Sequence, residues 1–413
     1  MQNPFHIFVG VDWGTENHCV CVLDREGNRI AERRVPHSGS GLQQLLTWLK
    51  QQTGVPAEQV AVAIEMPTGA IVEMLVEHNY PAFAINPKQL DRFRDRYSVA
   101  GAKDDSRDAF VLADSLRTDL HCFHSIQLKD PQIIRIRTLS RLHHDLQQDW
   151  SRLTNQLLQQ LHRYYPQMLE LSPAADDSWM WDLLERAPLP AQIGRLTLAR
   201  VEKILARHRI RRFSAEQVLE QLRTVPLPVA AGTAEAASEA ALLLIARIRL
   251  LEAQTKDVNR RIADLLLELQ TDPERPEHRD VQLLCSVVGV GQVVAATMLA
   301  EAYQPLIQRD YHALRSYAGT APVTWQSGKK KQVIMRYACN QPLRQALYHW
   351  ARVSLQKDAR SRAHYHRLRQ NGHSHGRALR GVADRLLAML ISMLKHQTMY
   401  DPARRGMSAR SAA

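Results

Sequence analysis

The order of apolar segments in the first 85 residues is the feature that most restricts how this chain can fold. Continuous apolar runs predict buried strands, alternation predicts half-buried strands, and a helical period predicts amphipathic helices. In chain order these patterns predict strands at 5–13, 17–24 and 29–36, a helix at 39–52, a strand at 60–65, a helix at about 70–79 and a strand at 82–85. Three antiparallel strands followed by alternating helices and strands indicate an α/β sheet. Ribonuclease-H-like nucleases share this order with actin-like and sugar-kinase ATPases.

Acidic residues stand at the ends of two of these strands and at the start of a later helix. Asp12 ends the first strand and Glu65 ends the strand that follows the first helix. Asp105 and Asp108 open a helix further along the chain. Carboxylates three residues apart on a helix project from one side, roughly 5–6 Å between Cβ atoms, and repel unless a cation lies between them. Taken alone, such a pair is also typical of a solvated acidic first turn.

In a ribonuclease-H-like sheet these two strand ends are neighbours, so all four acids are expected to converge. Four carboxylates can hold two Mg²⁺ ions roughly 3.5–4 Å apart, with Mn²⁺ as a substitute, and this is the geometry for in-line attack on a phosphodiester. The sequence therefore predicts a two-metal site of Asp12, Glu65, Asp105 and Asp108. Asp104 leaves one ligand ambiguous, because positions 104 and 108 also share a helix face.

The middle of the chain is dominated by two long helical segments. From Thr138 to Tyr164 the apolar positions recur at alternating spacings of three and four, the period of a coiled coil. A second long helix is predicted from Ala234 to Gln270, and the proline-containing residues 172–232 between them predict an irregular insertion with short helices. Two interpretations stay open: a coiled-coil pair that joins two domains and also two protomers, or a plain helical hairpin within one chain.

Positive charge is concentrated towards the C-terminus. From Arg309 onward there are 20 Lys/Arg and 4 Asp, a net +16, whereas the rest of the chain carries 34 Lys/Arg against 38 acids, a net −4. Such asymmetry indicates that the C-terminal part meets a polyanion. Residues 283–299 are typical of a helix-hairpin-helix, in which the turn with Gly289 and Gly291 lets backbone N–H groups approach a phosphate. Two basic helices, predicted at 341–369 and 376–396, follow.

The five cysteines are odd in number and show no CxxC spacing. They predict reduced thiols rather than a disulfide framework or a zinc site. No segment has the pattern of a signal peptide or a membrane span. The sequence therefore predicts a cytoplasmic protein without a membrane partner.

Several short motifs support a more specific interpretation when their order and spacing are taken together. In the first third they are Gly10-Val11-Asp12, Ile64-Glu65, Asn86-Pro87 and Lys103-x-Asp105-x-x-Asp108-Ala109. In the second half they are Val288-Gly289-Val290-Gly291, Tyr317-Ala318-Gly319-x-x-Pro322, Gln326-Ser327-Gly328 and Leu343-Arg344-x-Ala346-Leu347. This set resembles the IS-one-ten (IS110) family of DEDD/serine insertion-sequence transposases, which is related to Piv-type DNA invertases and bridge-RNA-guided recombinases.

The resemblance implies a particular domain organisation. It comprises a RuvC-like (ribonuclease-H-like) DEDD catalytic domain at 1–125, a coiled-coil linker at 130–272 with an insertion at about 166–235, a mainly α C-terminal serine transposase domain with a helix-hairpin-helix at 278–400, and a disordered tail at 401–413. The implied activity is cutting and rejoining of DNA strands in the bacterial cytosol or nucleoid. The implied partners are double-stranded donor and target DNA, a non-coding guide RNA, and further copies of the chain as dimers that pair into tetramers.

The same resemblance assigns roles to residues of the basic half. Ser327 is implied to be the nucleophile that links covalently to DNA, and a serine hydroxyl needs an activator to act so. Neighbouring lysines would lower the pKa of that hydroxyl or neutralise the phosphate. The expected nucleic-acid contacts are Gly289, Gly291, Lys329, Lys330, Lys331, Arg336 and Arg344. The sequence departs from the family pattern at Ala338-Cys339-Asn340, where lysine and glycine usually precede the asparagine, so the role of Asn340 is left open.

Three other functions are compatible with parts of the sequence. A RuvC-like structure-specific endonuclease would hydrolyse DNA with water and leave Ser327 structural. An actin-like or sugar-kinase ATPase is suggested by residues 9–15, which resemble a first phosphate loop, but it leaves Asp105 and Asp108 unexplained. A DNA-binding protein without enzymatic activity leaves all four acids without a role.

Overall fold

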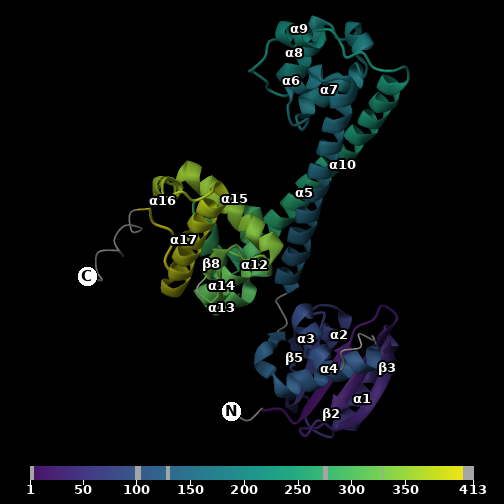
Figure 1. Ribbon diagram of the computed structural model, residues 1–413, viewed down its shortest axis with the longest axis vertical. Helices are drawn as coiled ribbons and strands as arrows, with labels where there is room; N and C mark the ends of the chain where they lie inside the picture. The colour runs from purple at the N-terminus through teal and green to yellow at the C-terminus, as the bar shows by residue number, and fades with distance from the viewer. Residues whose placement is uncertain (1–3, 98–103, 127–130, 273–277, 329, 403–413) are drawn as a thin grey trace, which may run out of the picture. The chain divides into compact units, whose positions relative to one another are not determined.

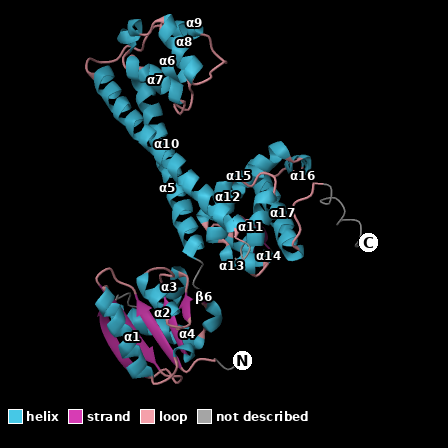
Figure 2. Cartoon of the chain, turned by 180° about the vertical axis from the view of Figure 1, so that it is seen from behind, coloured by secondary structure: helices cyan, strands magenta, loops and turns pink. Residues whose placement is uncertain are grey.

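The computed structural model describes residues 4–97, 104–126, 131–272, 278–328 and 330–402. The chain divides into two compact units, Met1–Asp130 and Pro131–Ala413 (Figures 1 and 2). Lys103, Lys329 and the expected tail from residue 403 onward lie outside the described residues, as does the side chain of Lys331.

The first unit is built on a six-stranded mixed sheet with the order β3-β2-β1-β4-β5-β6. The strands are β1 (Ile7–Asp12), β2 (Asn17–Leu23), β3 (Arg29–Pro36), β4 (Val60–Ile64), β5 (Ala82–Ala84) and β6 (His124–Ile126). β1, β4 and β5 run parallel, while β2, β3 and β6 pair antiparallel with their neighbours. The predicted α/β class is therefore confirmed. β6 was not predicted, because three residues are too few to show an alternating pattern.

Helices cover both faces of this sheet. α1 (Gly39–Thr53) and α2 (Ala70–Glu77) bury their leucine and isoleucine side chains against one face. α3 (Pro87–Tyr97) and α4 (Asp105–Thr118) cover the other face. α3 was not predicted, because its sequence PKQLDRFRDRY is mostly charged and buries few apolar side chains.

The second unit begins with two long helices that lie side by side, α5 (Pro131–Tyr164) and α10 (Thr233–Thr271) (Figures 1 and 2). Leu146 of α5 shares a core with Val258, and Leu157 shares another with Ile245, so the helices run antiparallel. Within the chain they form a helical hairpin. Leu142 was predicted as a seam position but is 44% exposed, so that part of the predicted apolar seam is wrong for this pair.

Short helices fill the insertion between α5 and α10, as predicted. They are α6 (Gln167–Leu171), α7 (Ser178–Arg186), α8 (Leu198–Arg207) and α9 (Ala215–Leu222). The insertion has a core of its own, which includes the fully buried Trp179 and Trp181 and continues onto the ends of α5 and α10.

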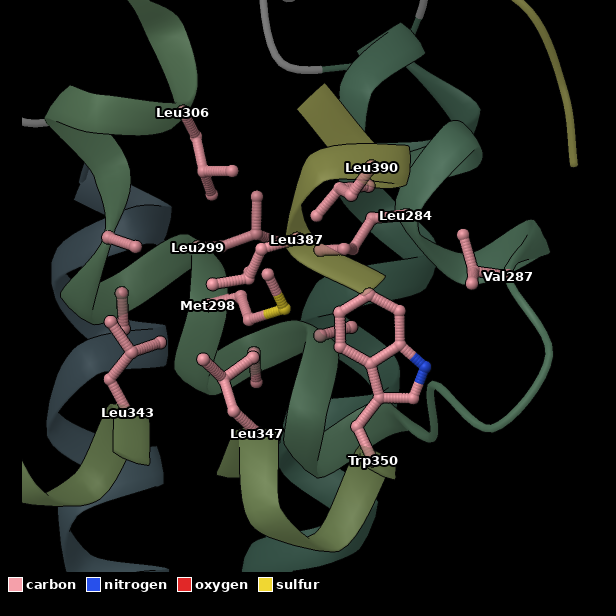
Figure 3. Packing of buried hydrophobic residues seen from close by; sticks show 14 of the residues in the cluster. Leu284, Val287, Met298, Leu299, Leu306, Leu343, Leu347, Trp350, Leu387 and Leu390 are labelled. Atoms are coloured by element: carbon pink, nitrogen blue, oxygen red, sulfur yellow. The ribbon is translucent and has the colours of Figure 1, made fainter. Parts of the chain in front are cut away.

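The remainder of the second unit is mostly helical. Its elements are α11 (His278–Ser286), α12 (Gln292–Glu301), α13 (Tyr303–Ile307), α14 (Tyr311–Tyr317), β7 (Val323–Ser327), β8 (Lys330–Ile334), α15 (Gln341–Lys357), α16 (Ala359–Gln370) and α17 (His375–His396). Figure 3 shows Leu347 and Trp350 of α15 pointing towards residues of α11, α12 and α17, including Leu284, Met298 and Leu387. This core holds α15 and α17 together.

One predicted helix of this region is wrong. The segment 341–369 is not continuous, because α15 ends at Lys357 and α16 starts at Ala359. Asp358 separates them, and its carboxylate accepts hydrogen bonds from the backbone N–H groups of Arg360 (3.4 Å) and Ser361 (3.0 Å). An aspartate at this position starts a new helix by satisfying its first donors.

The five cysteines are free thiols. Within the described ranges, no helix combines the length and the apolar composition that crossing a bilayer requires.

Candidate functional site

Two of the predicted acids lie at one edge of the sheet in the first unit. Val11 of β1 is paired in register with Ile64 of β4, and these two strands are parallel. Asp12 and Glu65 are the next residues on each strand, so they lie at neighbouring strand ends. The carboxyl ends of parallel strands are where α/β sheets place their ligands.

A glycine allows the helix that carries the other two acids to lie directly on the same strand. A Cβ atom at Gly10 would lie 1.9 Å from the carbonyl oxygen of Ala109 and 2.6 Å from the backbone nitrogen of Ala113. No other residue type fits that approach of helix to strand. Gly10 therefore brings α4, with Asp105 and Asp108 in its first turn, against the strand that ends in Asp12.

The electrostatics of Asp12 show that the four acids are close together. The pKa of Asp12 is raised from 3.8 to about 6, first by burial and then by the negative charges of Asp108, Asp105 and Glu65. Asp104 is not among these groups; its side chain accepts a hydrogen bond from the N–H of Ser106 (3.4 Å) and caps α4. The structure thus brings together the four predicted residues, and Asp105 rather than Asp104 acts on Asp12.

An arginine that the sequence did not single out lies among these acids. Arg94 of α3 donates from Nε and Nη2 to the two carboxylate oxygens of Asp108, each at 2.9 Å. Its Nη2 is also 3.6 Å from Oε2 of Glu65, and its Nη1 donates to Asp91 at 2.7 Å. The guanidinium lowers the pKa of Asp12 and partly offsets the crowded negative charge. No sequence signal distinguishes Arg94 from the other charged residues of α3.

The donor set is suited to a hard divalent cation, since all four side chains offer carboxylate oxygens. In the described part of the chain, however, no three His, Cys, Asp or Glu side chains are arranged as a ready metal-binding group. Arg94 occupies both oxygens of Asp108. A cation bound by Asp108 would therefore compete with this guanidinium for the carboxylate oxygens. The residues fit a metal chemically, with Arg94 as the competing cation.

Replacing Arg94 with glutamine should therefore strengthen divalent metal binding. Without the guanidinium, Asp108 and Glu65 lose their counter-cation, so we expect the metal-free protein to melt at a lower temperature and Mg²⁺ or Mn²⁺ to restore more of that loss than in the wild type. Titration calorimetry with Mn²⁺ and thermal unfolding with and without metal measure both effects. Arg96→Gln is the control, because Arg96 pairs with Asp119 and not with the four acids. Unchanged metal affinity in Arg94→Gln would contradict this role.

Ser327 lies at the end of a two-stranded hairpin in the second unit. Ser327, the last residue of β7, is paired directly with Lys330 of β8. Gly328, in the turn between the strands, has φ +55°. Directly opposite side chains in an antiparallel pair lie on the same face. Of the three predicted lysines, Lys330 is thus the cross-strand neighbour of Ser327. Both side chains are exposed.

An aromatic residue shares that face of the hairpin. Trp325 precedes Ser327 by two residues in β7, so their side chains point the same way, and Trp325 is 57% exposed. A tryptophan left in solvent next to a serine and a lysine offers a flat surface on which a nucleic-acid base can stack. The strands themselves were not predicted, because their exposed residues bury no face against a core.

The asparagine whose role the sequence left open anchors the chain that follows the hairpin. The Asn340 side chain accepts from the N–H of Leu343 (2.9 Å) and donates to Oε2 of Glu301 (2.8 Å). Glu301 is buried and receives hydrogen bonds from Arg141 of α5 at 2.6 and 3.1 Å. The backbone N–H of Asn340 donates to the carbonyl oxygen of Tyr317 at 2.8 Å. Asn340 therefore caps α15 and ties it to α12, α14 and α5.

The turn between α11 and α12 is held against α15. Gly289 has φ +87°, and a Cβ atom there would lie 3.0 Å from Oγ of Ser354 and 3.2 Å from Cδ1 of Trp350. The indole N–H of Trp350 donates to the carbonyl oxygen of Val288 at 3.1 Å. Packing against α15 thus explains why residue 289 is a glycine. Gly291 is exposed and precedes the first turn of α12. Of the two predicted contacts, Gly291 is the more accessible to a phosphate.

The two predicted arginines are half-buried and have no carboxylate partner among the described residues. Nε of Arg336 is buried without a hydrogen-bond partner in that set. Arg344 donates from Nη1 to Sγ of Cys339 at 3.5 Å. Half-buried guanidinium groups without a carboxylate partner are suited to binding an anion.

Comparison with known proteins covers both units. Residues 9–166 match a family model of DEDD, IS110 type described as a transposase, and residues 281–366 match one described as "Transposase IS116/IS110/IS902 family". A protein of Streptomyces coelicolor described as a mini-circle transposase for IS117 is 33% identical over 410 residues, which cover 98% of this chain and 97% of that protein. A protein of the IS110 insertion element from the same organism is 27% identical over 96% of this chain and 95% of its own length.

A shorter match is more similar. A protein of Sinorhizobium fredii described as a transposase is 46% identical over 216 residues, 52% of this chain and 60% of that protein. The matches that extend over nearly the whole chain include both the unit with the four acids and the unit with the serine hairpin.

Proposed function

This chain belongs to the IS110 family of insertion-sequence transposases, enzymes that cut and rejoin DNA, and on that premise we propose that it combines a DEDD carboxylate site with a serine nucleophile. The observation that carries the proposal is the convergence of Asp12, Glu65, Asp105 and Asp108 at one sheet edge. Family membership sets aside the ATPase and the non-enzymatic interpretations. A RuvC-like endonuclease that hydrolyses with water remains the alternative.

The four acids are proposed to hold the divalent metal that a DEDD domain indicates, Mg²⁺ with Mn²⁺ as a substitute. When bound, such ions align the scissile phosphate and stabilise the charge that develops on the leaving 3′ oxygen. Asp12 carries a raised pKa because it is buried among like charges, so a cation in this position would relieve its repulsion from its neighbours. Arg94 balances part of that charge until the acids take up their ligand.

Ser327 is proposed to attack the phosphorus of the scissile phosphodiester. A bond forms between its Oγ and the phosphorus as the bond from phosphorus to the 3′ oxygen breaks. The hydroxyl gives up its proton, and the leaving oxygen takes one up to become a free 3′-hydroxyl. A 3′-hydroxyl of another strand can then reverse the attack and release the serine, so no energy source is needed. Lys330, directly across the hairpin, would stabilise the negative phosphate.

The finer domain organisation follows the same proposal. The first unit would be a RuvC-like catalytic domain, and α11 and α12 a helix-hairpin-helix that receives a phosphate at Gly291. The substrate of a transposase is DNA, and the proposed contacts are Gly289, Gly291, Arg336, Arg344 and the lysines at 329–331. For Gly289 the support is weaker, because packing against α15 already explains it.

A guide RNA is proposed as a second nucleic-acid partner, on the strength of the family and the basic C-terminal part of the chain. Purifying the protein and sequencing the nucleic acid that accompanies it tests this directly. A single RNA species of defined sequence is the expected result. Only fragments of random sequence, from a preparation that is active on DNA, would contradict it.

Assembly into dimers, and into tetramers when two duplexes are joined, is proposed from the same family. Strand exchange needs at least two active sites. Leu243 and Leu250 lie seven residues apart on α10 and are 69% and 59% exposed, a spacing that suits a second helix from another copy. The acids and Ser327 also belong to different units of the chain. We therefore propose an active site in which acids of one copy act with the serine of another.

Mixing two inactive variants should restore cleavage if the site is shared between copies. Asp12→Asn lacks a functional acid site and Ser327→Ala lacks the nucleophile, but some mixed oligomers hold one intact pair. Single-strand cleavage or covalent attachment to DNA is the measurement, since full recombination requires every site. Mass photometry of tagged variants shows whether mixed oligomers form. If they form and no strand is cut, each site lies within one chain.

A further inference from the structure

Three arginines lie near the starts of α15 and α17, two helices that contact each other. Arg344 lies in the first turn of α15, and Arg377 and Arg380 lie three residues apart near the start of α17. Residues three apart on a helix share a face. Arg344 and Arg380 are half-buried, whereas Arg377 is exposed.

Ring contacts fix the two helices against each other at this place. Tyr348, one turn beyond Arg344, has its ring centroid 6.5 Å from that of His375 in α17. Nδ1 of His375 is 2.7 Å from the hydroxyl of Tyr365 in α16, so α16 also contacts α17 here. Figure 1 shows α15, α16 and α17 grouped together. The arginines thus lie in a surface of packed helices and not on a loop.

No carboxylate of these helices is available to the three arginines. Residues 341–400 contain 11 Lys/Arg and only two acids, Asp358 and Asp384. Asp358 caps α16, and Asp384 accepts from Arg315 at 2.9 and 2.6 Å. Arg309 is likewise held by both oxygens of Asp280, each at 2.7 Å. Arg309 and Arg315 are thus each neutralised by a carboxylate, whereas this cluster has none among the described residues.

Holding these like charges together costs free energy in the absence of an anion. Burial lowers the pKa of Arg380, and the positive charges of Arg344 and Arg377 lower it further, while Tyr337 and Tyr348 act in the opposite direction. An arginine stays protonated in proteins, so it cannot relieve this repulsion by losing its proton. A bound anion would remove it, and planar guanidinium groups match the oxygen pairs of a phosphate.

We propose that Arg344, Arg377 and Arg380 form a phosphate site for the backbone of a nucleic acid, with Tyr348 beside it to contact a sugar or base. The proposal rests on the function proposed above. It adds a nucleic-acid-binding surface made of residues outside the serine hairpin. A nucleic-acid backbone is favoured over a free anion because exposed tyrosine and histidine rings border the arginines.

The test is the salt dependence of binding to a DNA duplex of unrelated sequence. In R344Q/R377Q/R380Q the slope of log affinity against log KCl concentration should become shallower by about 0.9 for each phosphate contact that is lost, and affinity near 0.1 M KCl should fall at least about tenfold. Fluorescence anisotropy measures both. Thermal unfolding checks that the variant is folded. If it is not, R377Q alone serves, because Arg377 is exposed.

A matched control removes the same charge elsewhere. Arg186, Arg211 and Arg223 are exposed residues of the insertion, and their triple glutamine variant should keep the wild-type slope. An equal loss in both triple variants, or an unchanged slope in R344Q/R377Q/R380Q, would overturn the proposal. Displacement of the duplex by millimolar inorganic phosphate at constant ionic strength would identify a free-anion site instead. Since no cleavage is measured, failure here is distinct from failure of the serine or carboxylate chemistry.

Discussion

Asp12→Asn is expected to reduce the rate of metal-dependent strand cleavage by roughly 10³-fold or more. A bound ion contributes several kcal/mol of transition-state stabilisation, and it is misaligned when one of its ligands is removed. The protein should remain folded. The folded-state pKa of Asp12, about 6, lies above its ordinary value of 3.8. Stability is therefore lost as pH rises between these two values, and the full penalty is present at pH 7. Asparagine removes that charge, so the metal-free variant should melt at the same or a higher temperature.

The measurement is Mg²⁺-dependent cleavage of a duplex carrying the element end, together with thermal unfolding at pH 7. Asp95→Asn is the matched control, because Asp95 is an exposed acid of α3 and does not influence Asp12. Wild-type cleavage by folded Asp12→Asn would rule out a ligand role for this residue. A large fall in melting temperature would show instead that Asp12 supports the fold.

Ser327→Ala is expected to prevent any covalent link between protein and DNA. Removal of a serine nucleophile from a hydrolase lowers the rate on the order of 10⁶-fold, and a similar loss of strand transfer is expected here. A nicked duplex that cannot religate should trap the wild-type adduct, which is resolved from free protein by denaturing gel electrophoresis. Thr324→Ala is the control, because Thr324 is an exposed hydroxyl of the same strand that points to the opposite face. Cleavage that continues in Ser327→Ala would favour the hydrolytic endonuclease.

The sheet and the place of the acids could be predicted because they depend on strong local patterns. Buried strands are apolar throughout, and Asp12 and Glu65 interrupt that pattern where the strands end. Gly10 belongs to a sequence motif, but the physical reason for the glycine is its close contact with α4, which only the structure shows. A close approach between segments 100 residues apart leaves no trace in the local sequence beyond the glycine itself.

Interactions between charged side chains could not be predicted in the same way. Arg94 is one of five charged residues within six positions of α3, and nothing local shows that it, and not Arg96, faces Asp108. The same holds for the basic helices. Arg315 and Arg380 look alike in sequence, yet Asp384 holds one and no described carboxylate holds the other. Which carboxylate pairs with a given arginine depends on tertiary packing, and the spacing of apolar residues in the sequence does not encode it.

The serine hairpin could not be predicted from its local sequence pattern. Ser327 was assigned through family resemblance, and its own surroundings predicted no strand, because β7 and β8 bury no face and are held mainly by their own pairing. The structure adds the register, which selects Lys330 as the neighbour of the serine. It also gives Asn340 a structural role that the sequence had left open.

The most direct measurement is the identity of the amino acid that carries DNA after a trapped reaction. Wild-type protein is incubated with Mg²⁺ and the nicked duplex, digested with nuclease and protease, and analysed by mass spectrometry. We expect a nucleotide joined through its phosphate to the peptide that contains Ser327, and no such peptide from Asp12→Asn. Cleaved DNA without any nucleotide-bearing peptide, or a nucleotide on another residue, would contradict the combination of carboxylate site and serine nucleophile.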